Sequence, residues 1–268
     1  MQKTAREGGP MARTLLAIPV YNEEKYVERV LGRVVEYVPD VLVIDDGSTD
    51  ATPTLLARLP VEVIRHARNR GYGRSLMDAF RWAAVDGFDW VITMDCDEQH
   101  EPAALPDFLA AIERDDLDVV SGSRYLDTHP ENDRPPEERR RINGMITREL
   151  NDRLGLELTD SFCGYKAYRV RALDRLTLDV NGYAFPMQFW VQAVAAGLRI
   201  GELPVRLIYN DATRSFGGPL DNHDHRLSHY RKVLEREMDA CQAALAARQS
   251  GSSEGKTGAS TSTSRCPA

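Results

Sequence analysis

Short apolar runs alternate along the chain with longer segments whose apolar residues recur at helical spacing. The runs that fit buried strands are 14–20, 41–44, 61–64, 90–94 and a fifth that begins at Val119 and ends at Ser121-Gly122-Ser123. Between the first two runs, Val27, Val30, Leu31 and Val34 fall on one face of a helix. Strands that alternate with helices predict an α/β protein, Rossmann-like, with a mostly parallel central sheet and helices on both faces.

The two ends of the chain lack this alternation. Residues 1–12 are polar and hold no apolar signal core, and residues 249–268 are mostly Ser, Gly and Thr with scattered charge. We therefore expect disordered tails at 1–12 and 249–268 around one domain at 13–248, which includes a C-terminal helix at about 224–248. No apolar run approaches the roughly 18 residues of a transmembrane helix. We therefore expect a cytoplasmic protein, and any contact with the membrane is expected to be peripheral, at its cytoplasmic face.

Composition narrows the choice of partners. The net charge of −7 argues against a general nucleic-acid binder, which normally presents a basic face. The cysteines lie far apart and form no CxxC pair, so neither a zinc site nor a disulfide framework is indicated, and a reducing compartment fits. They are Cys96, Cys163, Cys241 and Cys266.

Polar residues follow the predicted strands at the point where each strand ends. They are Tyr21-Asn22-Glu23, Asp45-Asp46, Asp95-Cys96-Asp97 and Ser123-Arg124. In open parallel sheets, ligands bind beyond the carboxyl ends of the strands. The polar groups therefore meet where this architecture expects a ligand, and one of Asp45 and Asp46 is expected to contact a nucleotide. The alternative for Asp45-Asp46-Gly47-Ser48 is a turn that caps the next helix.

Two carboxylates and an amide offer an all-oxygen ligand set directly after the fourth strand. Asp95, Asp97 and Gln99 are of the type that Mg²⁺ or Mn²⁺ prefers, and such an ion keeps coordination positions for phosphate oxygens. Bound to a diphosphate, it would neutralise charge that grows on a leaving nucleoside diphosphate. A DxD sequence alone usually just faces water. Its position at a strand end, beside the other polar strand ends, favours the metal site.

Several motifs occur in an order that resembles family 2 glycosyltransferases with the GT-A fold. They are PVYNEE (19–24), VIDDGSTD (43–50), NRGYGRSL (69–76), MDCDEQHEP (94–102) and SGSRY (121–125). DSFCGYKAYR (160–169) further resembles the D-x-x-S-G-F-R-A-Y-R segment of the polyprenol-phosphate (dolichol-phosphate) mannosyl- and glucosyltransferases. The resemblance covers about residues 14–210.

The resemblance implies roles for individual residues. Those expected to bind the donor nucleotide sugar are Pro19, Tyr21, Asn22, Glu23, Asp45, Asp46, Gly71 and Asp95. Asp95, Asp97 and Gln99 match the ligands of the metal and diphosphate. Arg124 matches an arginine near phosphate groups, and Arg140 or Arg141 resembles a second one. A solvated helix start is the other interpretation of the run 139–141.

The acceptor decides whether a base is needed. A hydroxyl acceptor needs a carboxylate base, whereas a phosphate monoester, with a second pKa of about 6, is already anionic at neutral pH. Relatives often place a glutamate where this chain has Gln188, which cannot take a proton, so a phosphate acceptor is favoured, although Asp160 can serve as a base. The expected catalytic residues are Asp97, Arg124, Asp160 and Arg214.

Two departures from the family pattern favour a soluble acceptor instead. The R-x-x-G-x-S-K acceptor loop of the family is replaced by residues 213–218, with Arg214 as the candidate phosphate ligand, and no transmembrane segment is predicted after it. His223, His225 and His229 are a further open point: they are either extra metal ligands or part of a solvated helix start.

We therefore predict a metal-dependent inverting glycosyltransferase that uses Mg²⁺ or Mn²⁺. It is expected to move a hexose from GDP-mannose or UDP-glucose to a polyprenyl phosphate. The alternatives are the same chemistry on a soluble or glycan hydroxyl acceptor, and a non-catalytic module that binds nucleotide sugars. A sugar-phosphate nucleotidyltransferase fits poorly, because those enzymes usually carry a basic glycine-rich loop after the first strand, where this chain has Tyr21-Asn22-Glu23-Glu24.

Overall fold

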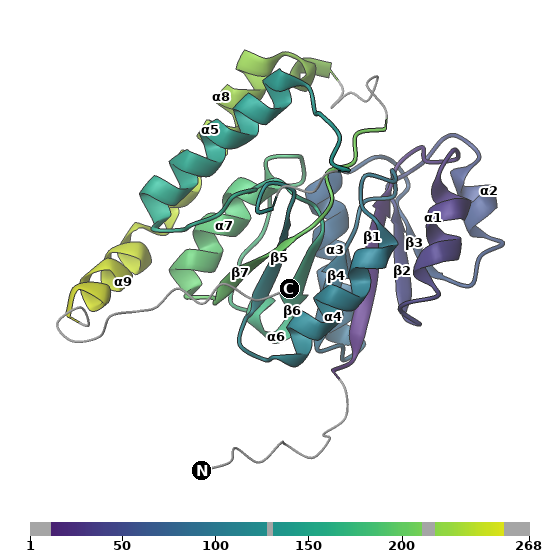
Figure 1. The fold of residues 1–268 in the computed structure, drawn as a ribbon, viewed down its shortest axis with the longest axis horizontal. Helices are drawn as coiled ribbons and strands as arrows, with labels where there is room; N and C mark the ends of the chain where they lie inside the picture. Colours follow the sequence, from purple (N-terminus) through teal and green to yellow (C-terminus); the bar gives the residue numbers. More distant parts are fainter. Residues whose placement is uncertain (1–11, 128–130, 211–217, 255–268) are drawn as a thin grey trace, which may run out of the picture.

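A seven-stranded sheet forms the centre of the protein (Figure 1). The computed structural model describes residues 12–127, 131–210 and 218–254. Its strands are β1 (Thr14–Val20), β2 (Val41–Asp45), β3 (Glu62–Arg65), β4 (Trp90–Thr93), β5 (Val119–Ser123), β6 (Lys166–Arg169) and β7 (Ile200–Pro204). They lie in the order β3-β2-β1-β4-β6-β5-β7, and only β6 runs antiparallel to its neighbours. The predicted mostly parallel sheet is confirmed, while β6 and β7 were not predicted.

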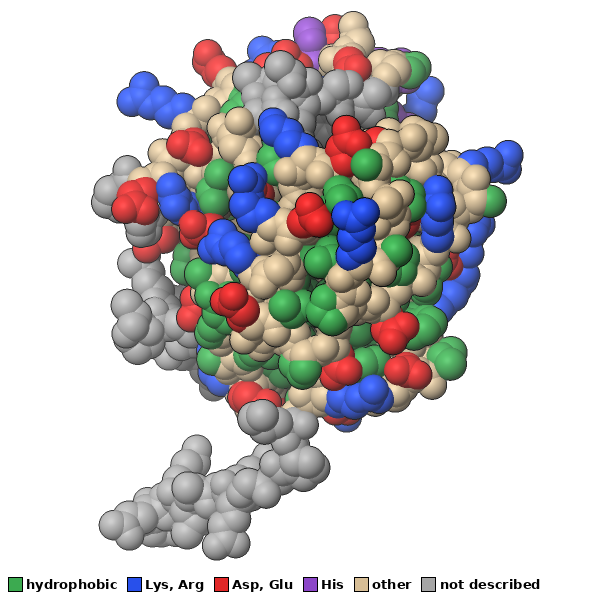
Figure 2. Space-filling model, turned by 90° about the vertical axis from the view of Figure 1, so that its right-hand side faces the viewer, with side chains coloured by type: hydrophobic (Ala, Val, Ile, Leu, Met, Phe, Trp, Pro, Cys, Tyr) green, Lys and Arg blue, Asp and Glu red, His purple; other side chains and the backbone are tan. Residues whose placement is uncertain are grey.

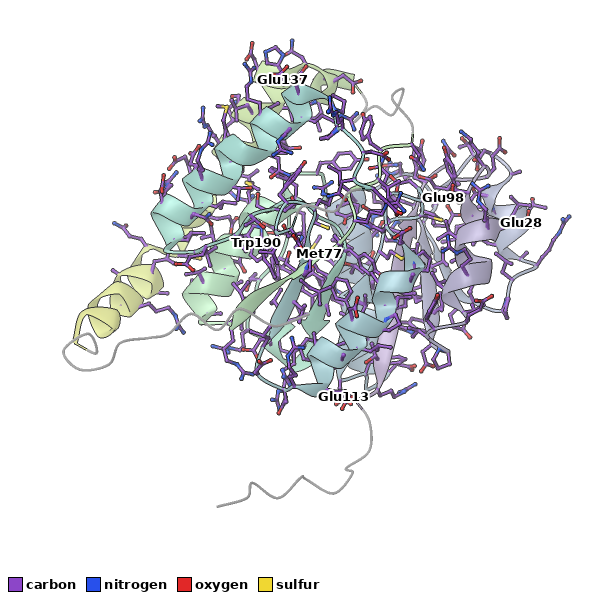
Figure 3. All side chains as sticks on the ribbon, viewed as in Figure 1. Glu28, Met77, Glu98, Glu113, Glu137 and Trp190 are labelled. Atoms are coloured by element: carbon purple, nitrogen blue, oxygen red, sulfur yellow. The ribbon has the colours of Figure 1, made fainter. Side chains whose placement is uncertain are left out.

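Helices cover both faces of the sheet, as expected, because successive strand residues point to opposite sides. Leu16 and Ile18 of β1 pack toward α1 (Val27–Val34), α2 (Thr52–Leu56) and α4 (Leu105–Glu113). Leu15 and Ala17 pack toward α3 (Tyr72–Val85) and α7 (Phe185–Ala196) on the other side. Figure 3 shows Met77 and Trp190, both buried, on the interior of these layers. Two hydrophobic cores therefore hold the sheet in place.

A further group of helices packs over α7 and extends the protein beyond the sheet. It consists of α5 (Glu137–Leu154), α8 (His223–Ala240) and α9 (Gln242–Glu254), and α5 and α8 lie side by side in Figure 1. α8 buries Tyr230 and Leu234 against this group. The remaining elements are the short helix α6 (Val170–Leu173) and the 3₁₀ turns η1 (Pro102–Ala104) and η2 (Gly218–Asp221).

The C-terminal helix differs from the prediction in two ways. The single helix expected at about 224–248 is two helices, because the backbone leaves helical geometry at Cys241 (φ −100°, ψ 6°). The bend lets α9 contact α7 and bury Leu245. In addition, α9 ends at Glu254, beyond the domain end expected at residue 248.

The surface mixes charges of both signs. Figure 2 shows Lys and Arg interspersed with Asp and Glu over one face of the molecule, with hydrophobic side chains between them. This pattern is ordinary for a solvent-exposed protein surface. Within the described ranges, no helix combines the length and the hydropathy needed to cross a membrane.

Candidate active site

The turns that follow β1 and β2 are locked together by hydrogen bonds. The Asn22 amide donates to Ser48 Oγ at 2.9 Å, and Asn22 Oδ1 accepts from the Thr49 amide at 2.8 Å. Asn22 has φ 56°, a left-handed conformation that Asn tolerates better than most residues. These contacts fix the backbone that carries the expected donor-binding residues. Pro19, Tyr21, Asn22 and Glu23 all line one cavity.

The structure separates the two aspartates after β2. Asp45 is fully buried, accepts the Ser48 amide at 2.8 Å and pairs with Arg65 at 3.1 Å, and it does not line the cavity. Asp46 does line it, and its carboxylate accepts the amides of Arg70 and Gly71, both at 2.8 Å. Asp45 therefore stabilises the turn. Asp46 holds the 69–71 loop at the cavity wall.

That loop is also fixed from the far side. A Cβ atom on Gly71 (φ 99°) would lie 2.4 Å from the Asn181 carbonyl oxygen, and one on Gly73 would lie 2.1 Å from that of Val180. The Arg74 amide donates to the Asn181 carbonyl at 3.1 Å. Glycine is required at both positions because the 71–73 backbone packs directly on the 180–182 backbone. The start of α3 and the turn before α7 therefore form one unit.

The expected metal ligands lie together at the end of β4. Asp95, Asp97 and Gln99 all line the cavity, and Asp97, only 7% exposed, accepts the Gln99 amide at 3.0 Å. Within the described ranges, no group of three or more His, Cys, Asp or Glu side chains is arranged so that it could hold a metal ion. Two carboxylates and one amide nevertheless fit Mg²⁺ or Mn²⁺, since these ions fill their remaining positions with water and phosphate oxygens.

His100 supports this segment from behind. Its Nδ1 accepts the Asp95 amide at 3.0 Å, and burial lowers the pKa of His100 to about 4, against partial compensation from the charge of Asp97. His100 is therefore neutral at physiological pH and carries its proton on Nε2. It holds the backbone of Asp95 in place while the Asp95 side chain lines the cavity.

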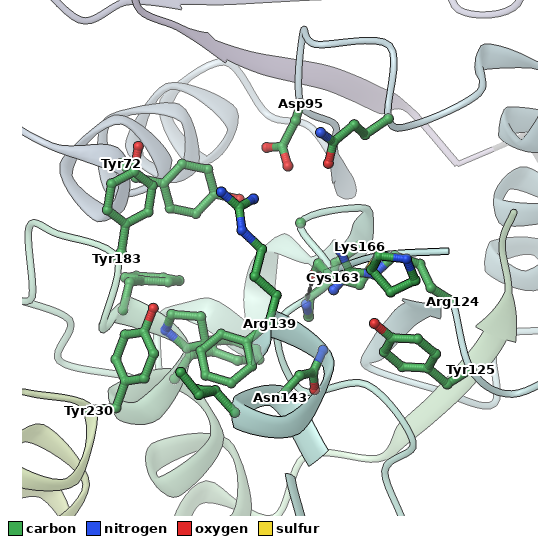
Figure 4. A pocket seen from close by; sticks show the side chains of 18 of the residues that line it. Tyr72, Asp95, Arg124, Tyr125, Arg139, Asn143, Cys163, Lys166, Tyr183 and Tyr230 are labelled. Atoms are coloured by element: carbon green, nitrogen blue, oxygen red, sulfur yellow. Dashed lines mark hydrogen bonds between the residues drawn. The ribbon is translucent and has the colours of Figure 1, made fainter. Parts of the chain in front are cut away.

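Two cavities meet in front of the sheet. The larger measures about 930 Å³ and lies over the ends of β1, β2 and β4, and the smaller measures about 230 Å³ and lies between the sheet and α5, α7 and α8. The residues that line both are Tyr72, Asp95, Gln99, Arg139 and Tyr183. Figure 4 shows Arg139 extending from α5 toward the side where Asp95 and Tyr72 lie. These five residues define the junction of the cavities.

The smaller cavity combines aromatic walls with positive charge. Its aromatic residues include Tyr125, Phe162, Tyr168, Phe185, Phe189, Tyr209 and Tyr230. Its cations are Arg124, Arg139, Lys166 and Arg226. Among the described residues that line it, Asp95 is the sole carboxylate. The cavity thus suits an anion attached to an apolar group.

Arg124 is held by a buried carboxylate. Asp160 has no exposed surface and accepts from Arg124 Nε at 2.6 Å, from Arg124 Nη2 at 3.0 Å and from Asn143 Nδ2 at 2.8 Å. Burial alone would raise the pKa of Asp160, but the charge and hydrogen bonds of Arg124 hold that pKa well below its usual range. A buried carboxylate with such a low pKa is a poor base. Asp160 therefore positions Arg124, and its contacts do not support the general-base role considered from the sequence.

The arginine run on α5 presents a different residue from the ones predicted. Arg139 lines both cavities, whereas neither Arg140 nor Arg141 does. Arg140 instead lies over the Tyr125 ring at 4.9 Å, and Arg141 is exposed. Consecutive helical residues point about 100° apart, so the three arginines point in different directions, and of them Arg139 lines the cavities. Arg214 lies outside the described residues.

Gln188 is also placed differently from the prediction. It is 1% exposed and lines neither cavity. Its Oε1 accepts the amides of Asp179 and Val180 at 2.8 and 2.9 Å, and its Nε2 donates to Glu237 at 2.9 Å. Gln188 therefore joins the turn before α7 to α8. The absence of a carboxylate at this position says nothing about the acceptor.

The C-terminal histidines form no common site. His229 lines the larger cavity, while His223 lies near Glu138 (3.9 Å) and Asp224 (3.2 Å). The His225 amide donates to the Asn222 side chain, which caps α8. Only His229 of these three therefore faces the space where a donor can bind.

Several residues that line the smaller cavity were not identified from the sequence. Tyr72 and Lys166 lie inside quoted motifs, but the motifs do not show which side chains point inward. Lys166 is buried beside the carbonyl oxygen of Cys163, and burial lowers its pKa. Tyr183 and Tyr230 lie outside any motif, so no local signal was available for them.

Comparison with known proteins agrees with this architecture. The family model described as "Glycosyl transferase family 2" matches residues 16–177. Undecaprenyl-phosphate mannosyltransferase of Micrococcus luteus is 35% identical over 217 residues, which cover 76% of this chain and 86% of that protein. Polyprenol monophosphomannose synthase of Mycolicibacterium smegmatis is 32% identical over 209 residues, which cover 73% of this chain and 77% of that protein.

Solved structures confirm the GT-A fold. Glucosyl-3-phosphoglycerate synthase from Mycobacterium tuberculosis superposes with a TM-score of 0.65 at 17% identity, covering 86% of this chain and 81% of that one. A complex of the same enzyme contains Mn²⁺, UDP and glucosyl-3-phosphoglycerate, with a TM-score of 0.63, 18% identity and coverage of 90% and 87%. Together with the family match and the two mannosyltransferases, this shows that the chain is a glycosyltransferase and belongs to glycosyltransferase family 2.

Proposed function

We propose that this glycosyltransferase transfers a mannosyl group from a nucleotide diphosphate sugar to polyprenyl phosphate, with inversion at the anomeric carbon. GDP-mannose is the first donor to test and UDP-glucose the second. The observation that carries the proposal is the pair of adjoining cavities. One is lined by the acidic strand ends, and the other by aromatic residues and four cations.

The donor is assigned to the larger cavity. There the locked turns after β1 and β2 offer ordered polar groups for a nucleotide, with Asp46 and the 69–71 loop at one wall. Asp95, Asp97 and Gln99 would hold Mg²⁺ or Mn²⁺ against the diphosphate, and the ion supplies positive charge that stabilises the leaving group. The Mn²⁺ and UDP found with the synthase from Mycobacterium tuberculosis support this assignment.

The acceptor is assigned to the smaller cavity. Arg124 and Arg139 can bind phosphate oxygens through charge-assisted hydrogen bonds, and the aromatic walls suit the first isoprene unit of a lipid. No carboxylate other than Asp95 lines this cavity in the described part of the chain. A hydroxyl acceptor would lack a base there, whereas a phosphate monoester needs none.

The reaction then requires no proton transfer from the protein. A phosphate oxygen in the smaller cavity attacks the anomeric carbon while the bond from that carbon to the diphosphate breaks. The electron pair of the broken bond leaves on the nucleoside diphosphate in the larger cavity. Because acceptor and leaving group approach the junction from opposite cavities, we expect inversion. The names of the mannosyltransferases from Micrococcus luteus and Mycolicibacterium smegmatis support the lipid phosphate acceptor.

Radiolabelled donors test the proposal directly. The protein is incubated with Mn²⁺, labelled GDP-mannose or UDP-glucose, and polyprenyl phosphate, and the products are partitioned into organic solvent. We expect label in the organic phase only when the lipid phosphate is present. Label that stays in water but moves to 3-phosphoglycerate or a glycan identifies a soluble acceptor. Binding without hydrolysis or transfer identifies a non-catalytic module.

A further inference from the structure

Two tyrosines stand at the junction of the cavities. Tyr72 begins α3 and Tyr183 lies in the turn before α7, and both line the larger and the smaller cavity. Their rings are stacked, with centroids 5.9 Å apart and planes inclined by 16°. The stacked rings therefore border the junction of the two cavities, where a group transferred between them would lie (Figure 4).

The Tyr72 hydroxyl lies beside the carboxylate of Asp95. A Cβ atom on Gly164 would come within 2.6 Å of Asp95 Oδ2 and within 2.8 Å of the Tyr72 hydroxyl oxygen, so both atoms occupy the space above this glycine. A tyrosine hydroxyl in this place can donate a hydrogen bond to a ligand that bridges the cavities.

The surrounding backbone holds Tyr72 in place. Asp46 accepts the Gly71 amide, and Gly71 and Gly73 pack directly on the 180–182 backbone, which leads into Tyr183. The two rings are thus carried by the unit formed by the start of α3 and the turn before α7. A rigid polar group that faces a substrate hydroxyl can discriminate strongly between sugars, because the wrong sugar leaves it without a partner.

We infer that Tyr72 and Tyr183 determine which hexose is transferred: the Tyr72 hydroxyl hydrogen-bonds a hydroxyl of the sugar, and the stacked rings pack against its apolar C–H face. This inference rests on the proposed function, since the transferred sugar lies at the junction only if donor and acceptor occupy the assigned cavities. It concerns the sugar alone. The base and the diphosphate lie in the larger cavity and do not depend on Tyr72.

Calorimetry separates the sugar contact from the nucleotide contacts. Wild type and Tyr72→Phe are titrated, with Mn²⁺ present, with GDP, GDP-mannose and GDP-glucose, and with UDP, UDP-glucose and UDP-galactose. For the preferred nucleotide sugar we expect Tyr72→Phe to weaken binding roughly 3- to 10-fold, the effect of one lost hydrogen bond, and to leave the nucleoside diphosphate unchanged. Tyr37→Phe, at an exposed tyrosine that lines neither cavity, is the matched control and should match wild type.

The ring contact is tested by a second pair of variants. Tyr183→Phe keeps the ring stack and should preserve the preference within each epimeric pair, mannose over glucose or glucose over galactose. Tyr183→Ala removes the ring stack and should reduce that preference. Thermal unfolding of each variant establishes that the fold is kept. Steady-state kcat/KM values for the two epimers should show the same change in preference as the binding constants.

Different results would overturn the inference and the proposed function. If Tyr72→Phe weakens the nucleoside diphosphate and the nucleotide sugar equally, Tyr72 contacts the diphosphate or the metal and the inference is wrong. An unchanged affinity for every sugar also overturns it. If wild type transfers a sugar normally in either case, the proposed function stands. A wild-type protein that binds nucleoside diphosphates but no nucleotide sugar contradicts both.

Discussion

The two cavities of this protein are built in different ways. The walls of the larger one come chiefly from turns at the ends of β1, β2 and β4, which are joined by hydrogen bonds such as those of Asn22 and Asp46. The smaller one is assembled from side chains on separate elements, including Arg124 after β5, Arg139 on α5 and Tyr230 on α8. The first depends on short sequence motifs, and the second depends on how distant segments pack.

This difference predicts different consequences of substitution. The residues after β4 line the larger cavity, so a change there should affect chemistry and leave the fold intact. Around the smaller cavity, buried polar residues such as Asp160 and Gln188 hold the walls in position. Substitutions of these residues should lower the stability of the fold, and activity should fall as a consequence of that loss.

The largest effect on stability is expected for Asp160→Asn. The substitution removes the buried partner of Arg124 and should lower the free energy of unfolding by about 3–5 kcal/mol, the usual result of breaking a buried ion pair. Because the pKa of Asp160 is lowered in the folded state, its stabilisation is complete above the unfolded-state pKa of about 3.9 and is lost as the pH falls below that value.

Urea unfolding of wild type and Asp160→Asn across the acid range checks this expectation. The difference between them should be constant near neutral pH and should shrink below about pH 4. Asp152→Asn, at an exposed carboxylate on α5, is the matched control. A different result would assign Asp160 the role of a base. In that case Asp160→Asn would be as stable as wild type, and its activity would fall below that of wild type only at pH values above a pKa near neutrality.

Asp97→Asn should reduce transfer by on the order of 1,000-fold, because the metal would lose a charged ligand beside the diphosphate. The thermal stability of the metal-free protein should change little, in contrast to Asp160→Asn. EDTA should abolish wild-type activity, and added Mn²⁺ should restore it. Asp107→Asn, at an exposed carboxylate in the first turn of α4, should behave as wild type. Full activity in EDTA would remove the metal from the mechanism.

Arg139→Ala tests the junction itself. One lost charge-assisted hydrogen bond to a phosphate corresponds to about 1.5–3 kcal/mol, so kcat/KM for the acceptor should fall roughly 10- to 150-fold. Arg141→Ala, two residues further along α5 and exposed, is the control and should retain activity. If the two variants exchange these behaviours, Arg141 and not Arg139 faces the acceptor.

The smallest effect is expected for Gln188→Glu. A carboxylate at this position would face the carboxylate of Glu237, now 2.9 Å from Gln188 Nε2, and like charges repel. We expect a loss of about 1–2 kcal/mol in the free energy of unfolding and no gain of a catalytic base. Gln242→Glu at the exposed start of α9 provides the comparison. Faster transfer to a hydroxyl acceptor by Gln188→Glu would place the side chain in the active site.

Much of the larger cavity could be predicted from the sequence. β1, β2 and β4 are apolar runs followed at once by polar residues, and parallel strands bring their carboxyl ends to one edge of the sheet whatever the details of packing. For this reason the sequence alone predicts that Asp46, Asp95 and Asp97 lie near each other. The strands β6 and β7 were missed because they are short and mix polar with apolar residues, as in KAYR and IGELP.

The sequence by itself thus determined the alternation of strands and helices and the acidic edge of the sheet, because both follow from local patterns. Only the tertiary structure decided which of Arg139, Arg140 and Arg141 faces the site. Adjacent helical residues differ by about 100° in direction, and the packing of α5 on α7 and α8 selects one of them. Tertiary contacts elsewhere turned Gln188 away from the cavities, through its hydrogen bonds to the turn before α7 and to Glu237 of α8. The packing of the 71–73 backbone on the 180–182 backbone brought Tyr72 and Tyr183 together from segments more than 100 residues apart.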